Sequence, residues 1–158
     1  MKALIVYDSF FGNTEKIALA VGKAIGNQKD VRVSRVADVN PDQLEDLNVL
    51  IAGSPTRAFS PTPAMKTFLK SIPQKSLCGV KVTAFDTRIA MAEKVPGILK
   101  FFANLFGYAD KPMLDILKKK GGETSIPSEG FFVVGSEGPL ADGELDRAAA
   151  WAARIKTG

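Results

Sequence analysis

The polar stretch from Asp8 to Asn13 carries the residues of this chain that best suit the binding of an anion. Gly12 lets the backbone come close to a ligand, and Ser9 and Thr14 supply hydroxyl donors. A helical pattern begins at Thr14, and the first N–H groups of a helix lack intrahelical acceptors and carry the positive end of its dipole. The pattern therefore predicts a phosphate site that needs no lysine and no metal ion. The alternative interpretation is an ordinary strand-to-helix turn that Asn13 or Thr14 caps.

This turn lies between a predicted buried strand and a predicted amphipathic helix. Ala3 to Tyr7 is a continuous apolar run, as in a strand that is covered on both faces. From Thr14 onward apolar residues recur with the period of a helix, which Gly26 ends. The spacing matches neither the nucleotide P-loop, with its Gly-Lys-Ser/Thr ending, nor the three-glycine dinucleotide fingerprint. A terminal phosphomonoester therefore fits this loop better.

Strands and helices alternate along the rest of the chain. We predict further strands at residues 31–36, 48–53, 79–85 and 131–134, with 123–126 as a first half of the last one. We predict a short helical turn at 41–47 and helices after Pro63, at 111–119 and at 142–155, the last capped by Asp142 with Leu145 on its inner side. This order implies a parallel sheet with helices on both faces. We therefore expect one α/β domain, residues 1–158, with a doubly wound five-stranded sheet in three α/β/α layers.

Three polar clusters follow the C-terminal ends of predicted strands one, three and four. In a doubly wound sheet these ends meet at one edge, and ligands bind there near the point where the strand order reverses. We therefore expect the clusters to form one site. Its candidate residues are Ser9, Phe10, Phe11, Gly12, Asn13 and Thr14 from the first cluster, Pro55, Thr56, Arg57, Ala58 and Phe59 from the second, and Asp86, Thr87 and Arg88 from the third.

The composition excludes several kinds of catalytic and metal site. The chain has no histidine and a single cysteine, Cys78, which we interpret as an inert buried thiol. These counts exclude Ser-His-Asp and Cys-His catalytic units, multi-thiolate metal sites and an internal disulfide. Any chemistry must then come from carboxylates, a lysine or a bound cofactor, and the cofactor gains most.

The charge and hydropathy of the chain indicate neither a nucleic-acid partner nor a membrane span. The 21 basic and 17 acidic residues give a net charge of +4, and only Lys118 to Lys120 form a basic run, at a predicted helix C-terminus. No aromatic residues interleave with that run, so we expect no nucleic-acid binding. No apolar run approaches the ~20 residues that span a bilayer, and Met1-Lys2 leads directly into the first strand. We therefore predict a cytoplasmic protein.

Three stretches resemble the flavodoxin-like family, and the similarity runs over essentially the whole chain. VYDSFFGNTEKIA (6–18) is similar to the family's first strand, FMN-phosphate loop and first helix. GSPTRAFSPTPAMKTFL (53–69) is similar to its third-strand loop, and FFVVGSEGPLADGEL (131–145) is similar to the end of many flavodoxin domains. The resemblance implies the strand order 2-1-3-4-5 and bound FMN, with the flavin at the switch between strands one and three.

The resemblance also implies roles for the candidate residues. Ser9, Thr14 and the amides from Phe10 to Asn13 would hold the phosphate, and Pro55 to Phe59 and Asp86 to Arg88 would lie on either side of the isoalloxazine ring. The protein would then carry electrons between redox protein partners through its flavin, with no residue as acid or base. Two alternatives remain open: an FMN-dependent NAD(P)H or quinone oxidoreductase of the same fold, and a scaffold or regulatory domain that has lost flavin binding.

Several residues depart from the family pattern. Phe10 and Phe11 stand where electron-carrier flavodoxins usually have threonines, and if their rings fill the phosphate site, no flavin will be found. Phe59 is the only aromatic residue in the presumed ring loops, and it either stacks on the flavin or plugs a gap between loop and core. Arg57 and Arg88 either lie near the ring, where they would stabilise its reduced anionic form or bind an acidic substrate, or are solvated. The basic net charge implies redox partners different from those of acidic carriers.

Residues 89–110 form a predicted insertion that is long for a connection in an α/β unit. Apolar residues recur at helical spacing between Gly97 and Phe106, which predicts an extra helix with a broad apolar face. Such a face packs on the domain's own core, shields the flavin as a lid, or forms a homodimer interface. We expect the lid or the dimer, because residues 111–119 already supply the regular crossover helix.

Overall fold

The computed structural model describes residues 1–27, 29–90, 97–98, 101 and 107–157. Helices and strands alternate along the chain, as the sequence predicts. In chain order they are β1 (Ala3–Tyr7), α1 (Asn13–Ile25), β2 (Val31–Arg35), β3 (Val49–Pro55), α2 (Pro63–Ser71), β4 (Lys81–Ile89), α4 (Asp110–Lys119), β5 (Glu123–Thr124), β6 (Glu129–Val133) and α5 (Glu144–Ala153). Short 3-10 turns lie at Val36–Asp38, Pro41–Leu44 and Arg154–Thr157.

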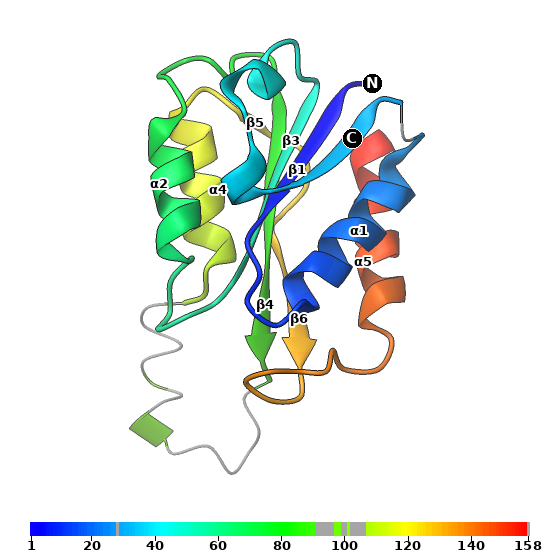
Figure 1. The fold of residues 1–158 in the computed structure, drawn as a ribbon, viewed down its shortest axis with the longest axis vertical. Coiled ribbons are helices and arrows are strands. Elements are labelled where there is room, and N and C mark those ends of the chain that lie inside the picture. Colours follow the sequence, from blue (N-terminus) through cyan, green and yellow to red (C-terminus); the bar gives the residue numbers. More distant parts are fainter. Residues whose placement is uncertain (28, 91–96, 99–100, 102–106, 158) are drawn as a thin grey trace.

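All strands belong to one parallel sheet whose order is β2-β1-β3-β4-β5 (Figure 1). The last position of the sheet is divided between two segments. β5 pairs with Lys81 and Val82 at the start of β4, and β6 pairs with Phe85–Ile89 further along the same strand. The predicted order 2-1-3-4-5 and the predicted division of the last strand are therefore confirmed.

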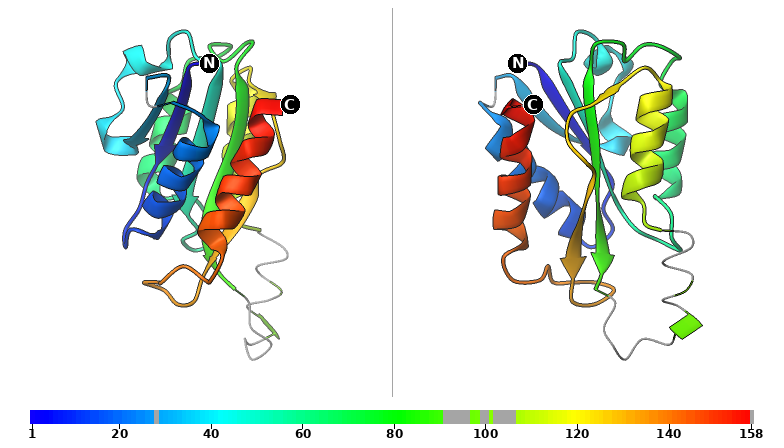
Figure 2. Two further views of the ribbon diagram at one scale, coloured as in Figure 1. Left: turned by 90° about the vertical axis from the view of Figure 1, so that its right-hand side faces the viewer. Right: turned by 180° about the vertical axis from the view of Figure 1, so that it is seen from behind.

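Among the described elements, two helices cover each face of the sheet (Figure 1), which confirms the predicted three layers. α1 and α5 lie on one face and α2 and α4 on the other (Figures 1 and 2). Side chains alternate along each strand, so Ile5 and Ile51 belong to the core beneath α1 and α5, whereas Leu4 and Leu50 belong to the core beneath α2 and α4. The first core is closed by three edge-to-face ring contacts, at centroid distances between 5.9 and 6.2 Å, among Phe85, Phe131 and Trp151.

The structure corrects several predicted boundaries. β4 runs to Ile89 because β6 pairs with its second half, so Asp86 to Arg88 lie within the strand and not beyond it. β3 likewise includes Pro55, which lies opposite Thr87 of β4.

The C-terminal helix and the cysteine also differ from the prediction. α5 begins at Glu144 after Gly143, whose φ is 81°, so Asp142 does not cap it. Leu145 is exposed, and Trp151 fills the inner face that we assigned partly to that leucine. Cys78 is exposed and not buried.

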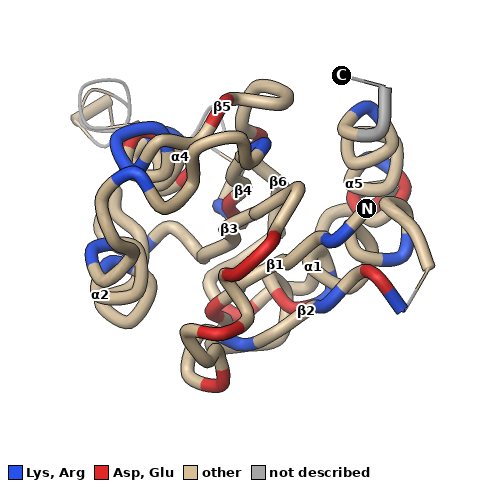
Figure 3. Tube along the Cα trace, turned by 90° about the horizontal axis from the view of Figure 1, so that it is seen from above, with Lys and Arg blue, Asp and Glu red and all other residues tan. Residues whose placement is uncertain are grey.

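The predicted helix at 97–106 lies largely outside the described residues, so the lid and the homodimer stay predictions. None of the described helices has the length and apolar character that a transmembrane span requires. Lys and Arg residues are distributed over several elements, among them α2, α4 and β2 (Figure 3).

Candidate functional site

A pocket of about 240 Å³ lies at the C-terminal edge of the sheet, where the three predicted clusters meet. It contains every predicted site residue except Gly12, Phe59 and Asp86. Its lining consists of Ser9, Phe10, Phe11, Asn13, Thr14, Pro55, Thr56, Arg57, Ala58, Thr87, Arg88, Ile89, Val133 and Ser136. The structure therefore brings the ends of β1, β3 and β4 together and adds the end of β6.

The loop after β1 presents unpaired backbone donors to this pocket. Gly12, with φ of 87°, precedes α1 as its N-cap and forms no side-chain cap. Its own N–H donates to Ser9 Oγ at 3.0 Å. Among the residues that the structure describes, the N–H groups of Phe10, Phe11 and the first three residues of α1 find no acceptor. Three of these groups belong to the first turn of α1 and two to the loop before it, and open N–H groups at a helix N-terminus suit an anion.

Neither Asn13 nor Thr14 caps α1, which contradicts the ordinary-turn interpretation. Asn13 Nδ2 donates to the carbonyl of Glu137 at 3.0 Å, which ties the loop to the segment after β6. Thr14 Oγ1 shares a hydrogen bond of 2.8 Å with Thr87 Oγ1 on β4. Both side chains therefore join neighbouring elements at the pocket, and each keeps an acceptor or donor that a ligand can use.

Asp8, which we did not predict, holds this loop in place. Its carboxylate accepts hydrogen bonds from the N–H of Ser9 at 2.9 Å and from Thr62 Oγ1 at 2.6 Å. Thr62 is the N-cap of α2, so Asp8 links the loop after β1 to the loop after β3. Arg35 lies 3.8 Å from the carboxylate and donates to the carbonyl of Ser9 at 2.8 Å. The signal for Asp8 in the sequence was that it is a charged residue directly after the buried strand β1.

Successive side chains of β4 point to opposite faces of the sheet. The residues of the third cluster, Asp86 to Arg88, therefore point in two directions. Thr87 points toward α1, where it meets Thr14. Asp86 points toward α4, is fully buried, and accepts hydrogen bonds from Thr56 Oγ1 and from the N–H of Asp110, each at 3.1 Å. Arg88 binds Asp86 with two hydrogen bonds of 2.7 and 2.8 Å. Its Nη2 also donates to Asp110 at 3.0 Å.

The polar groups of Asp86, Arg88 and Asp110 bind one another and their neighbours, and we call these three residues the closed cluster. Ser128 Oγ donates to the second oxygen of Asp110 at 2.7 Å, and the Arg88 guanidinium lies 3.8 Å from the centroid of the Tyr108 ring. A side chain at Gly130 would overlap that guanidinium, so any larger residue there would displace Arg88 from this position. The solvated alternative for Arg88 is therefore wrong: only 15% of its side chain is exposed, and its charge faces two carboxylates.

Burial acts on the pKa values of Asp86 and Arg88 in opposite directions. Burial raises the pKa of Asp86 to about 6, although the hydrogen bonds from Arg88 oppose this rise. Burial by itself would lower the pKa of the Arg88 guanidinium, but the hydrogen bonds and the attraction of Asp86 outweigh it and raise that pKa. These hydrogen bonds and the attraction of Asp86 therefore favour the charged form of Arg88.

Arg57 differs from Arg88 in having no carboxylate partner among the described residues. Its guanidinium carbon lies 5.0 Å from the centroid of the Phe10 ring. Its backbone pairs with Ser60 in a tight turn in which Ala58 and Phe59 have positive φ values of 47° and 64°. Phe59 does not line the pocket.

Besides Asp8, which supports the loop but does not line the pocket, sequence reasoning missed three residues of the lining. Ile89 and Val133 end β4 and β6, and Ser136 follows β6. Ile89 was missed because we predicted that β4 ends at Phe85, whereas it ends at Ile89. Val133 and Ser136 lie in the stretch 131–145, whose similarity to the end of flavodoxin domains was the only signal for them.

Comparison with solved structures gives close matches over nearly the full chain. A flavodoxin from the domain Archaea superposes with a TM-score of 0.71 at 22% identity, covering 99% of this chain and 97% of its own. The chain has the flavodoxin-like fold. A WrbA-like flavodoxin from Agrobacterium tumefaciens matches with a TM-score of 0.74 at 18% identity, covering 99% and 95%. Oxidised flavodoxin 1 from Bacillus cereus gives 0.71 at 16%, covering 99% and 98%. No protein-family model and no curated protein matches the sequence. In this flavodoxin-like fold, the pocket lies at the strand-order reversal between β1 and β3.

Proposed function

We propose that this protein binds FMN in the pocket and carries electrons through it. The observation that carries the proposal is the set of unpaired N–H groups at the start of α1, next to the hydroxyls of Ser9 and Thr14. These donors surround one end of the pocket and form a cradle for a single phosphate dianion. The loop lacks the features of a triphosphate or dinucleotide site, so a flavin with one terminal phosphate fits best.

The other end of the pocket fits a planar ring. The lining there includes residues 55–58, from the end of β3 and the turn after it, together with Ile89 and Val133 at the ends of β4 and β6. The Phe10 and Phe11 side chains are 55% and 49% exposed, so their rings lie at the mouth and do not fill the phosphate cradle. This argues against the flavin-free scaffold.

The pocket offers binding groups and no acid or base. Bound FMN would supply the electron-transfer chemistry, and the chain would bind it, orient it and limit its contact with water. Among the described residues, the charged side chains of the lining are those of Arg57 and Arg88. We propose an electron carrier with redox protein partners, and an oxidoreductase that acts on NAD(P)H or a quinone by itself is the alternative. A cytoplasmic location is part of the same proposal.

The visible spectrum of the purified protein, before and after FMN is added, tests this function. We expect a bound-flavin spectrum that FMN restores to stripped protein and that FAD restores far less well. A protein that binds neither flavin would contradict the proposal. Anaerobic addition of NADH or NADPH then separates the two redox roles: we expect no bleaching without a separate reductase, and rapid bleaching would favour the oxidoreductase.

A further inference from the structure

The aromatic surface of the pocket comes from the loop after β1 and not from the loops expected to hold a ring. Phe59, the only aromatic residue of the predicted ring loops, is absent from the lining. Phe10 and Phe11 line the pocket instead, although both follow the strand that leads into the phosphate cradle. Among the residues that the structure describes, an aromatic wall for a bound ring therefore comes from Phe10 or Phe11.

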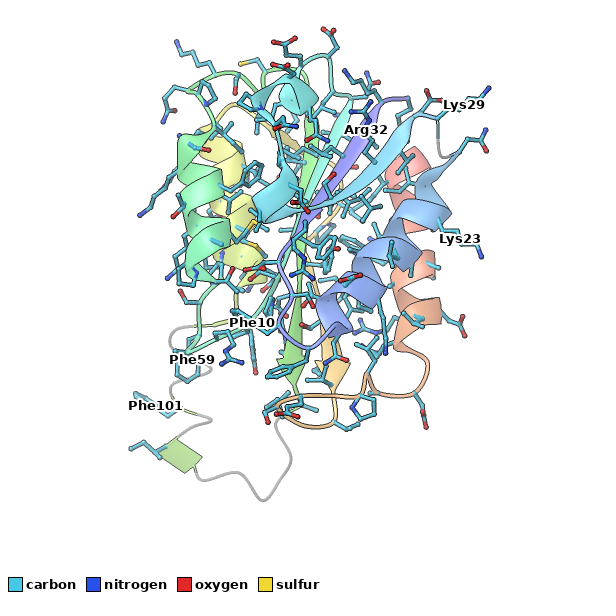
Figure 4. The ribbon with its side chains drawn as sticks, viewed as in Figure 1. Phe10, Lys23, Lys29, Arg32, Phe59 and Phe101 are labelled. Atoms are coloured by element: carbon cyan, nitrogen blue, oxygen red, sulfur yellow. The ribbon has the colours of Figure 1, made fainter. Side chains whose placement is uncertain are left out.

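Phe10 is distinguished from Phe11 by its contact across the pocket. Arg57, on the turn after β3, places its guanidinium carbon 5.0 Å from the centroid of the Phe10 ring. Phe10 thus reaches from the loop at α1 to the turn after β3, and Figure 4 shows it at the end of the molecule where Phe59 also lies. Among the described residues, Phe11 forms no comparable contact with a ring or a cation.

The Arg57 contact also fixes which face of Phe10 is free. A guanidinium over one face of an aromatic ring leaves the opposite face for another flat group. Phe10 is 55% exposed, so a ligand can cover a large part of it. Offset or edge-on contact between aromatic rings adds free energy beyond the area that it buries.

We propose that Phe10 is the residue that packs against the isoalloxazine ring of bound FMN, with Arg57 behind it. The proposal rests on the proposed function, since it concerns the same pocket. It assigns the loop after β1 two tasks: its backbone holds the phosphate and its first phenylalanine positions the ring. The Arg57 charge then lies beyond Phe10 and not in the plane of the flavin.

Parallel titrations with FMN and riboflavin test this role, because only a ring contact affects both ligands equally. The variants are Phe10→Ala and the matched control Phe59→Ala, a phenylalanine outside the lining. We expect Phe10→Ala to weaken both ligands by roughly 5- to 100-fold, as when an aromatic platform is removed from a stacked base. Phe59→Ala should change both affinities by less than about threefold. Phe10→Trp should restore affinity and alter the visible circular dichroism of the flavin.

The outcomes separate this inference from the function on which it rests. Wild-type protein that binds no FMN would overturn both. Wild-type protein that binds FMN, with Phe10→Ala no weaker than Phe59→Ala, would overturn the role of Phe10 alone. A loss confined to FMN, with riboflavin unaffected, would mean that Phe10 acts by shaping the phosphate loop, and it would also overturn the inference. Thermal unfolding of each variant checks that the loss does not come from misfolding.

Discussion

The two polar regions that flank the pocket use their hydrogen-bonding groups in opposite ways. At the start of α1, the N–H groups of Phe10, Phe11 and residues 13–15 have no acceptors among the described residues, and Ser9 Oγ accepts one hydrogen bond, from the N–H of Gly12. At the C-terminal half of β4, Asp86 and Arg88 bind each other, Asp110 and Thr56. Open donors beside a cavity can bind a ligand, whereas a saturated cluster stabilises the fold around it. The difference separates binding residues from supporting ones in a site where the sequence shows only polar clusters.

The largest expected effect comes from opening the closed cluster. Arg88→Met would leave the carboxylates of Asp86 and Asp110 buried without a cation, so we expect the free energy of unfolding to fall by about 3–5 kcal/mol. Denaturant unfolding measures this loss. Lys81→Met is the matched control, because it breaks an exposed ion pair with Glu123 and should change stability little. Equal losses in both variants would remove the supporting role from the cluster.

Removing hydroxyls from the open region should reduce binding and leave the fold intact. In the double variant Ser9→Ala with Thr14→Ala, we expect FMN binding to weaken by a few kcal/mol at most, on the order of 1.5–3 for each charge-assisted hydrogen bond lost. The backbone donors remain, so binding should persist. Riboflavin, which has no phosphate, should bind both proteins alike. Fluorescence quenching measures all four affinities, and an equal loss for riboflavin would contradict the assignment of these hydroxyls to the phosphate.

The closed cluster should also give stability an unusual dependence on pH. Folding raises the pKa of Asp86 from 3.8 to about 6, so the stability linked to its proton is full below about pH 4 and is lost as pH rises through about 6. The wild type should therefore lose up to ~3 kcal/mol of its free energy of unfolding, relative to Asp86→Asn, between pH 4 and pH 7.

A second buried carboxylate provides the opposite case. Hydrogen bonds from Arg147 lower the pKa of Glu144, so its contribution is present above its unfolded pKa and is lost on acidification. The free energy of unfolding of the wild type, relative to that of Glu144→Gln, should therefore decrease as pH falls. Urea unfolding at several pH values measures both slopes, and slopes of the same sign would contradict the comparison.

The smallest expected effect concerns Arg57, which has no carboxylate partner among the described residues. Arg57→Gln should make the reduced, anionic flavin harder to form and shift the potential negative by tens of millivolts, at about 20 mV per 0.5 kcal/mol for one electron. Arg32→Gln is the control: it removes the same charge from β2, and Figure 4 shows Arg32 at the other end of the molecule. Spectroelectrochemical titration compares the two. Equal shifts would make Arg57 a general surface charge.

The fold and the members of the pocket could be predicted from sequence because they depend on local patterns. The apolar run of β1, the helical period after Thr14 and the repeated strand-helix order determine the topology. The same order brings the ends of β1, β3 and β4 to one edge of the sheet.

What the sequence does not show is which polar groups pair across the fold. Asp8 and Thr62, or Arg88 and Asp110, are far apart in the chain, so nothing local indicates that their charges and hydroxyls satisfy one another. The direction of Phe10 depends likewise on Arg57 of another loop. The limits of β4 were missed because its second half pairs with β6, a strand more than forty residues later.

The ratio of FMN to riboflavin affinity in the wild-type protein tests the central claim most directly. The two ligands share the ring and differ in the phosphate, so their ratio reports the contribution of the donors at the start of α1. If these donors hold a phosphate, FMN should bind at least about 100-fold more tightly, since two charge-assisted hydrogen bonds of ~1.5 kcal/mol supply that factor. Riboflavin binding as tightly as FMN would contradict the account, because the loop after β1 would then contribute nothing to recognition.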